Sequence, residues 1–197
     1  MKNEQTFSRQ LGILFILPLF AYGIGNALVE SHVAQTETTA FPSLLVGSLL
    51  IGLNAVLVVA IAWKLLPRLK AENPPLAVGY AVARVAEALL LMLALTLWIG
   101  GKPDLQQSLY QWGMLSLALG SVPLCWFWWK ASWLPGWLAI WGVIGYSLLG
   151  LGALGELMGW PYGIMLSLPG GLFELSLGIF LLVKGFARTP APTFAAH

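Results

Sequence analysis

Three ionisable side chains lie inside segments that otherwise consist of apolar and small residues. Arg84 and Glu87 are three residues apart in "ARVAEALLLML" (83–93), and Glu174 lies in "LPGGLFELSLG" (168–178). A charged residue at the centre of a membrane helix costs about 2.5–3.5 kcal/mol on insertion scales, so such residues face a helix bundle or a wet cavity and commonly mark functional sites. One guanidinium and two carboxyls could hold a ligand, handle a proton or lock helices together.

The charges of these three groups do not cancel. Arginine stays protonated, so one of the two carboxylates can neutralise Arg84. The second carboxyl then has no counter-charge within the protein, and two carboxyls that share a site do not both ionise readily. We therefore expect Glu87 and Glu174 to share a proton near neutral pH, or a bound cation or cationic group to supply the missing charge.

The composition indicates a membrane protein. Of the 197 residues, 58% are hydrophobic and 9% are charged, whereas a soluble domain carries about 25% charged residues. The net charge of +2 and the lack of a basic run give no sign of a nucleic-acid partner. A single cysteine, Cys125, excludes an internal disulfide, and the two histidines, His32 and His197, cannot supply a bis-histidine haem or a three-histidine zinc site. We expect no cofactor and no metal.

Six windows are long enough to span a bilayer core, which takes about 20 mainly apolar residues. They are 10–29, 44–64, 76–99, 105–129, 137–158 and 164–184. The first follows "MKNEQTFSRQ" and has the outline of a secretory signal, but we expect it to be retained as a transmembrane helix. The sequence therefore predicts an all-α fold, in which residues 1–197 form one integral membrane bundle of six transmembrane helices.

The distribution of Lys and Arg predicts the orientation of the bundle. With a cytoplasmic N-terminus, one side of the membrane carries Lys2, Arg9, Lys64, Arg68, Lys70, Lys130, Lys184 and Arg188, and the other carries Lys102 alone. This asymmetry predicts that both termini are cytoplasmic. Interfacial tryptophans are expected near the turn between the fourth and fifth windows, at Trp126, Trp128, Trp129, Trp133 and Trp137. An aromatic pocket of Trp133, Trp137 and Trp141 is an alternative interpretation.

Counting residues places the buried polar groups at a common depth. Glu87 lies roughly 16 Å into its window from one side, and Glu174 lies roughly 15 Å into its window from the other side. Asn54, ten residues before Lys64, reaches a similar level. Tyr80 shares a helical stripe with Arg84 and Glu87, so we expect it to belong to the same ligand or proton site. Because Gly171 and Gly178 flank Glu174 at helical spacing, we expect Glu174 to lie in a helix interface, and we predict a midplane cluster of Asn54, Arg84, Glu87 and Glu174.

The segment "LPGGLFELSLGIFLLVKGF" (168–186), together with Arg84 and Glu87, resembles a bacterial membrane family, domain of unknown function 4386. The resemblance rests on Pro169, Phe173, Glu174 and the run to Lys184–Phe186, and Phe180 stands where tryptophan is expected. It implies a multi-pass protein of a bacterial inner membrane and no established activity. A 3+3 inverted repeat, with Glu87 and Glu174 in comparable places, is a further hypothesis.

Three functions remain open. The first is a small receptor or carrier for a small-molecule, lipidic or proton ligand, in which Arg84 holds an anionic group, Glu87 and Glu174 set the proton count, and the "LPGG" break before Glu174 loosens the helix. The second is an accessory subunit that docks a protein partner or a second copy through small-residue faces such as Gly155 and Gly159, with the charged cluster as a structural lock. The third is an enzyme acting on lipid, which the sequence disfavours because the windows lack histidine and a G-x-S-x-G elbow. A zinc site at Asn26, Glu30, His32 and Glu156 is not expected, because polar residues are ordinary at helix ends.

Overall fold

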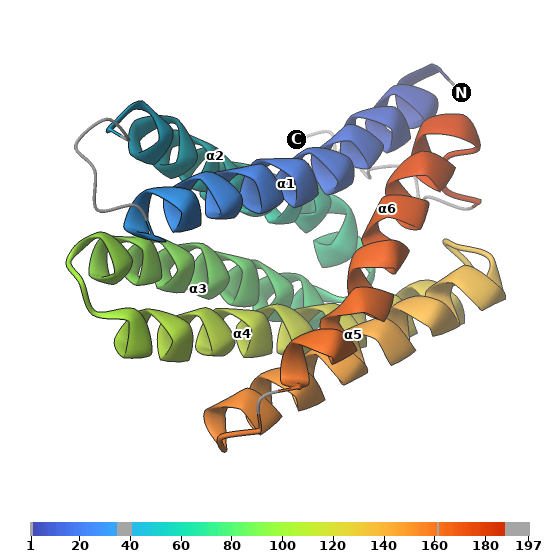
Figure 1. Ribbon diagram of the computed structural model, residues 1–197. Coiled ribbons are helices and arrows are strands. Elements are labelled where there is room, and N and C mark those ends of the chain that lie inside the picture. Colours follow the sequence, from blue (N-terminus) through green and yellow to red (C-terminus); the bar gives the residue numbers. More distant parts are fainter. Residues whose placement is uncertain (1, 35–40, 161, 188–197) are drawn as a thin grey trace.

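A computed structural model describes residues 2–34, 41–160 and 162–187 of the chain (Figure 1). These residues fold into six α-helices and one short 3-10 helix: α1 (Lys2–Ala34), α2 (Phe41–Glu72), α3 (Pro74–Ile99), α4 (Pro103–Lys130), α5 (Gly136–Leu157), η2 (Gly163–Ser167) and α6 (Leu168–Val183). The predicted all-α fold with six helices is confirmed. Arg188 and His197, used in the sequence analysis, lie outside the described residues, and so does the side chain of Lys2.

The six helices form a ring. Each α-helix packs against the next in chain order, and α6 packs against both α5 and α1, which closes the ring (Figure 1). Short connections such as Gly100–Lys102 and Ala131–Pro135 keep consecutive helices side by side and opposite in direction. Side chains on the inner faces of all six helices therefore meet in the middle of the ring.

Five of the described helices are long and apolar enough to cross a membrane: Glu4–Val33, Pro42–Glu72, Pro74–Ile99, Gly136–Leu157 and Met165–Val183. The predicted window 105–129 coincides with α4, which does not reach this level of hydropathy. The first turns of α4 carry "PDLQQS", and Gln111 and Ser121 add polar side chains further along the helix. Both of these residues are buried inside the bundle, at 4% and 1% exposure. The chain is a multi-pass membrane protein.

Proline and asparagine set the start of the helix that carries Arg84 and Glu87. Asn73 caps α3, because its side-chain oxygen accepts a hydrogen bond from the Leu76 amide at 3.2 Å. Pro74 and Pro75 occupy the first turn, where their missing amide hydrogens leave no bond unmade. The "LPGG" segment works in a similar way, since Pro169 lies in the first turn of α6. The break expected before Glu174 is therefore a helix start that follows η2, and Pro169 does not kink a continuous helix.

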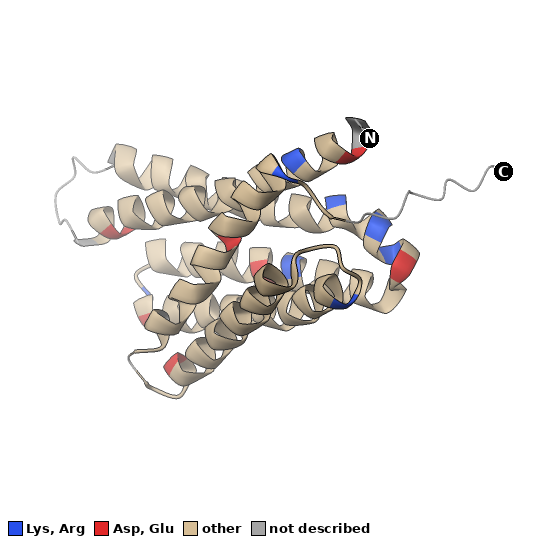
Figure 2. Cartoon of the chain, turned by 90° about the vertical axis from the view of Figure 1, so that its right-hand side faces the viewer, with Lys and Arg blue, Asp and Glu red and all other residues tan. Residues whose placement is uncertain are grey.

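The two described ends of the chain meet at one end of the bundle. The Phe186 amide donates a hydrogen bond to Ser8 Oγ at 3.3 Å, and the rings of Phe7 and Phe186 are 6.3 Å apart. Arg68 forms a bidentate ion pair with Glu4 at 2.7 and 2.9 Å at this same end. Figure 2 shows most Lys and Arg residues toward the end of the bundle at which α1 begins. The positive charge is thus segregated in space as well as along the sequence.

The tryptophans between α4 and α5 divide into two groups. Trp126 and Trp137 are exposed, as expected for an interfacial belt, whereas Trp128 and Trp133 are buried at 1% and 0% exposure. Both buried rings pack on Phe186, at 5.8 and 5.4 Å. The belt prediction is wrong for these two residues, because the segment after α6 covers them. Trp133 also precedes α5, so it does not share a helical face with Trp137 as the alternative aromatic pocket required.

Candidate functional site

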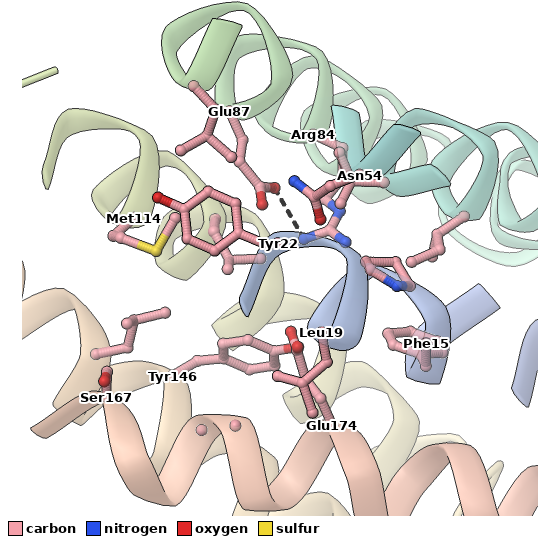
Figure 3. Close-up of a pocket in the computed structure, with 18 of the residues that line it drawn as sticks. Phe15, Leu19, Tyr22, Asn54, Arg84, Glu87, Met114, Tyr146, Ser167 and Glu174 are labelled. Atoms are coloured by element: carbon pink, nitrogen blue, oxygen red, sulfur yellow. Dashed lines mark hydrogen bonds and ion pairs between the residues drawn. The ribbon is translucent and has the colours of Figure 1, made fainter. Parts of the chain in front are cut away.

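A cavity of about 240 Å³ lies in the middle of the ring, and all six helices contribute to its lining. Four of the residues singled out from the sequence line it: Asn54 on α2, Arg84 and Glu87 on α3, and Glu174 on α6. In Figure 3, Asn54, Arg84 and Glu87 project from one wall, and Glu174 faces them from the opposite wall. Arg84, Glu87 and Glu174 lie close to the middle of their helices.

Arg84 and Glu87 form an ion pair within α3. The Nη1 atom of Arg84 donates to Glu87 Oε2 at 2.8 Å, and both side chains are only 3–4% exposed. A spacing of three residues places both side chains on the same face of a helix, so α3 alone brings the two groups together. Tyr80 lies one turn away, with its ring centroid 5.9 Å from the guanidinium carbon. Tyr80 is buried beside the pair and does not line the cavity.

The polar wall has unused hydrogen-bonding capacity. Asn54 is only 4% exposed and lines the cavity, yet its side chain forms no hydrogen bond with any described residue. The Nε atom of Arg84 is buried and likewise has no partner within the described chain. Buried polar groups are nearly always hydrogen-bonded to protein, water or ligand. Two neighbouring groups without partners therefore point to something held in the cavity.

Glu174 forms its hydrogen bond with a residue that the sequence did not indicate. The hydroxyl of Tyr146, on α5, donates a hydrogen bond to Glu174 Oε1 at 2.7 Å. Among the described ion pairs, Arg84 is joined to Glu87 and not to Glu174. Glu174 therefore lines the same cavity as the Arg84–Glu87 pair, and the described chain shows no ion pair between Glu174 and Arg84. The cavity separates the two walls, because α3 and α6 lie on opposite sides of the ring.

Glycines fix the position of α6 between its two neighbours. A Cβ atom on Gly12 would lie 2.7 Å from the Gly178 carbonyl oxygen, so α1 and α6 approach each other through their backbones. A Cβ atom on Gly145 would lie 3.0 Å from Gly170 Cα, which brings α5 equally close. Glu174 lies between these two contacts. The expected helix interface is thus formed by α6 with α1 on one side and α5 on the other.

Further along, α1 and α6 leave more room. A Cβ atom on Gly171 would meet only the Leu19 side chain, at 3.9 Å, and one on Gly23 would meet nothing within 4 Å. Both glycines line the cavity, together with Leu19 and Pro18. The α1–α6 side of the cavity is therefore bordered by small residues and flexible side chains.

Three tyrosines also line the cavity, and none of them was predicted from the sequence. They are Tyr22 on α1, Tyr110 on α4 and Tyr146 on α5. The rings of Tyr22 and Tyr110 stack at 5.8 Å with an interplanar angle of 16°. Counting depth along the window 137–158 places Tyr146 about nine residues in, roughly 14 Å, at the level of Glu174. The same count that linked Asn54 with the two glutamates would therefore have found Tyr146.

Other residues weighed from the sequence lie elsewhere. Gly155 is covered by the Trp160 ring, since a Cβ atom there would lie 2.6 Å from that ring. Gly159 adopts a positive φ of 87° in the turn after α5. Gly155 thus packs within the chain's own turn, whereas Gly159 is exposed and a Cβ atom there would meet nothing within 4 Å. Within the described residues, no group of three or more His, Cys, Asp or Glu side chains is arranged to hold a metal ion.

Comparison with known proteins gives one result. A family model described as Domain of unknown function (DUF4386) matches residues 11–101 and 103–185, which include every residue of the cavity. No curated protein and no solved structure matches the chain.

Proposed function

The chain belongs to the family described as Domain of unknown function (DUF4386), and from this premise we propose that it is a small membrane receptor or carrier whose central cavity binds a small polar or lipidic ligand. The supporting observation is the Asn54 side chain, which has no hydrogen-bonding partner among the described residues and is buried next to the Arg84–Glu87 pair in a cavity of about 240 Å³. An amide without a hydrogen-bonding partner does not stabilise a helix bundle, because burying an unsatisfied polar group costs free energy.

The proposal includes six membrane spans with both chain ends in the cytoplasm of a bacterial cell. Helix α4 is as long as its neighbours and packs between α3 and α5 (Figure 1). Two of the polar residues that lower its hydropathy, Gln111 and Ser121, are buried inside the bundle. Lipid does not reach them there, so they do not prevent α4 from crossing the membrane. The segregation of Lys and Arg toward one end of the bundle supports the orientation (Figure 2).

We assign the Arg84, Glu87 and Glu174 side chains to charge balance in the cavity and Asn54 to ligand contact. Tyr80 has a supporting role, because it packs beside Arg84 outside the cavity. Ligand exchange with the membrane is proposed between α1 and α6, where Gly23 and Gly171 leave room. In this account α6 moves relative to α1 while the Gly12–Gly178 contact serves as the pivot.

Infrared difference spectroscopy tests the charge balance. One guanidinium balances one carboxylate, so we expect a carboxylic acid C=O band that titrates between about pH 5 and pH 9. The band should disappear in Glu87→Gln or Glu174→Gln. Glu30→Gln, at the exposed end of α1, is the matched control and should leave the band unchanged. Spectra without a titrating carboxyl band, or a band retained by both cavity variants, would contradict the proposal.

A second candidate function is an accessory subunit in which the polar groups lock helices together. It is favoured by one observation: Arg84 has Glu87, and Glu174 has Tyr146, so each charged group already has a partner within the chain. Hydrogen bonds between membrane helices contribute about 0.6 kcal/mol on average, which suits such a lock. Under this alternative, the unsubstituted protein shows no titrating carboxyl band, and the glutamate variants lose stability but keep a partner protein in a mild-detergent pull-down.

A further inference from the structure

We propose that the ligand is a small organic cation with a hydrogen-bonding group at its far end, which places its ammonium group beside Glu174 and its far end at Asn54. The inference rests on the proposed function of the cavity as a ligand site and narrows the ligand class. It also revises the expectation that Arg84 holds an anionic group. An anion at Arg84 would lie beside the Glu87 carboxylate, whose Oε2 is 2.8 Å from Arg84 Nη1, and the two like charges would repel each other.

The first step is the charge of the two walls. Arg84 and Glu87 neutralise each other within α3 and carry no net charge together. On the opposite wall, the partner of Glu174 is the neutral hydroxyl of Tyr146, which stabilises the carboxylate without cancelling its charge. A ligand that brings one positive charge to the Glu174 wall makes the whole cavity neutral. An anionic ligand would instead add a second uncompensated negative charge to a buried site.

The second step is the aromatic lining. Tyr146 contacts Glu174 directly, and the stacked rings of Tyr22 and Tyr110 line the same cavity. The faces of aromatic rings attract cations, and this attraction is strongest where water is excluded. A carboxylate with several tyrosines around one cavity therefore suits an ammonium group better than a neutral or anionic group.

The third step is the opposite end of the ligand. Asn54 carries both a donor and an acceptor and has no partner among the described residues. It lies on the wall that faces Glu174 across the cavity (Figure 3). A hydroxyl or carbonyl on the ligand would satisfy this amide, and a purely apolar end would leave it unpaired. Sites that hydrogen-bond a ligand group discriminate strongly against analogues that lack it.

The size of the cavity limits the ligand. An apolar cavity of about 150 Å³ accommodates benzene, which has six non-hydrogen atoms. By proportion, the 240 Å³ of this cavity suits a molecule of about ten non-hydrogen atoms. The ligand class is therefore an amine with a short apolar body and one further polar group, and not a two-chain lipid.

Four small probes separate these requirements. Tyramine has an ammonium group and a phenol hydroxyl, 4-propylphenol is its uncharged isostere, phenethylamine lacks the hydroxyl, and 4-hydroxyphenylacetate is an anion of similar size. Binding is measured at equilibrium with radiolabelled tyramine, and with the other three as competitors, on the full chain in phosphatidylcholine nanodiscs. Empty nanodiscs give the background from partitioning into lipid.

We expect tyramine to bind at least about tenfold more tightly than 4-propylphenol, because only tyramine gains a charged partner. Glu174→Gln should remove this difference, and Glu30→Gln should keep it. The glutamine can still accept the hydrogen bond from Tyr146, so the interface between α5 and α6 is retained. Asn54→Leu should weaken tyramine about fivefold and leave phenethylamine unchanged. Elution as a single monodisperse peak verifies that each variant is folded.

Two results would overturn the inference. Equal binding of tyramine and 4-propylphenol, or tighter binding of the anion, removes the cation class but leaves a ligand-binding cavity, so the proposed function stands. Failure of all four probes to bind saturably removes the ligand class as well. The infrared titration then decides the proposed function independently, because it needs no ligand.

Discussion

At the scale of single residues, the polar groups of the cavity differ in how completely they are satisfied. Arg84 and Glu87 pair within one helix, Glu174 pairs with Tyr146 across a helix interface, and Asn54 has no partner within the described chain. A structural lock explains the first two pairs equally well. The Asn54 amide favours a binding cavity over a lock, because it lines the cavity without a partner among the described residues and contributes no hydrogen bond between helices there.

Breaking the Arg84–Glu87 pair should lower the free energy of unfolding strongly, whereas replacing both residues by apolar ones should change it little. Arg84→Met leaves Glu87 buried without its counter-charge, and we expect a loss of about 3–5 kcal/mol in the free energy of unfolding. The double variant Arg84→Met, Glu87→Met should recover most of this loss, because two apolar side chains of similar length fill the same space. Titration with a denaturing detergent, followed by tryptophan fluorescence, measures both values.

Arg68→Met is the matched control for this experiment. It breaks the ion pair with Glu4, whose side chain is 37% exposed, so water can solvate the remaining carboxylate and the loss should be smaller. A double variant at residues 84 and 87 that is as unstable as Arg84→Met alone would contradict the account. It would mean that Arg84 holds the bundle together through contacts other than its ion pair.

Much of the cavity could be predicted at this scale, and the reason is energetic. Insertion cost alone singled out Arg84, Glu87 and Glu174, and depth added Asn54; all four line the cavity. The pairing of Glu174 with Tyr146 could not be predicted, because it depends on how α5 and α6 are rotated about their axes. Both helices are apolar on nearly every face, so their sequences do not indicate which side turns inward.

At the scale of helices, hydropathy predicted where each helix lies in the sequence, but it did not predict which side chains are buried between helices. Each of the six windows overlaps one helix, since about 20 apolar residues between turn residues leave few alternatives, but α1 and α2 extend well beyond their windows 10–29 and 44–64. The burial of Trp128 and Trp133 was not predicted, because it depends on Phe186, which is more than 50 residues away in the sequence. The contact between Gly12 and Gly178 is likewise long-range, and only the Gly178 side of it was visible as a small-residue stripe.

Helix α4 gives the prediction at this scale. If α4 crosses the membrane, the loops at its two ends lie on opposite sides. In a Cys125→Ser background, Lys102→Cys should react with an impermeant maleimide added to intact cells, and Ser132→Cys should react only after the membrane is opened. Reaction of both positions from the same side would show that α4 does not cross. Cys125 is fully buried, so its replacement removes a residual background without exposing a new group.

At the scale of the whole molecule, the ring has two distinct parts. One end is closed by the Arg68–Glu4 pair and by aromatic rings that include Phe7, Trp128 and Phe186. The cavity lies farther along, where α1 and α6 have room between Gly23 and Gly171. A closed end and a cavity with room between α1 and α6 fit the proposed exchange of ligand with the membrane, and a lock needs neither feature.

The central claim is that the space between Asn54 and Glu174 is a binding site, and an experimental density map tests it most directly. The protein is extracted with its native lipids, without added ligand, and imaged by electron cryomicroscopy with a bound antibody fragment to provide size. The account predicts non-protein density within hydrogen-bonding distance of Asn54 and beside Glu174. A collapsed cavity, in which Glu174 contacts Arg84 directly and Asn54 bonds to a neighbouring helix, would contradict it and identify the polar groups as a lock.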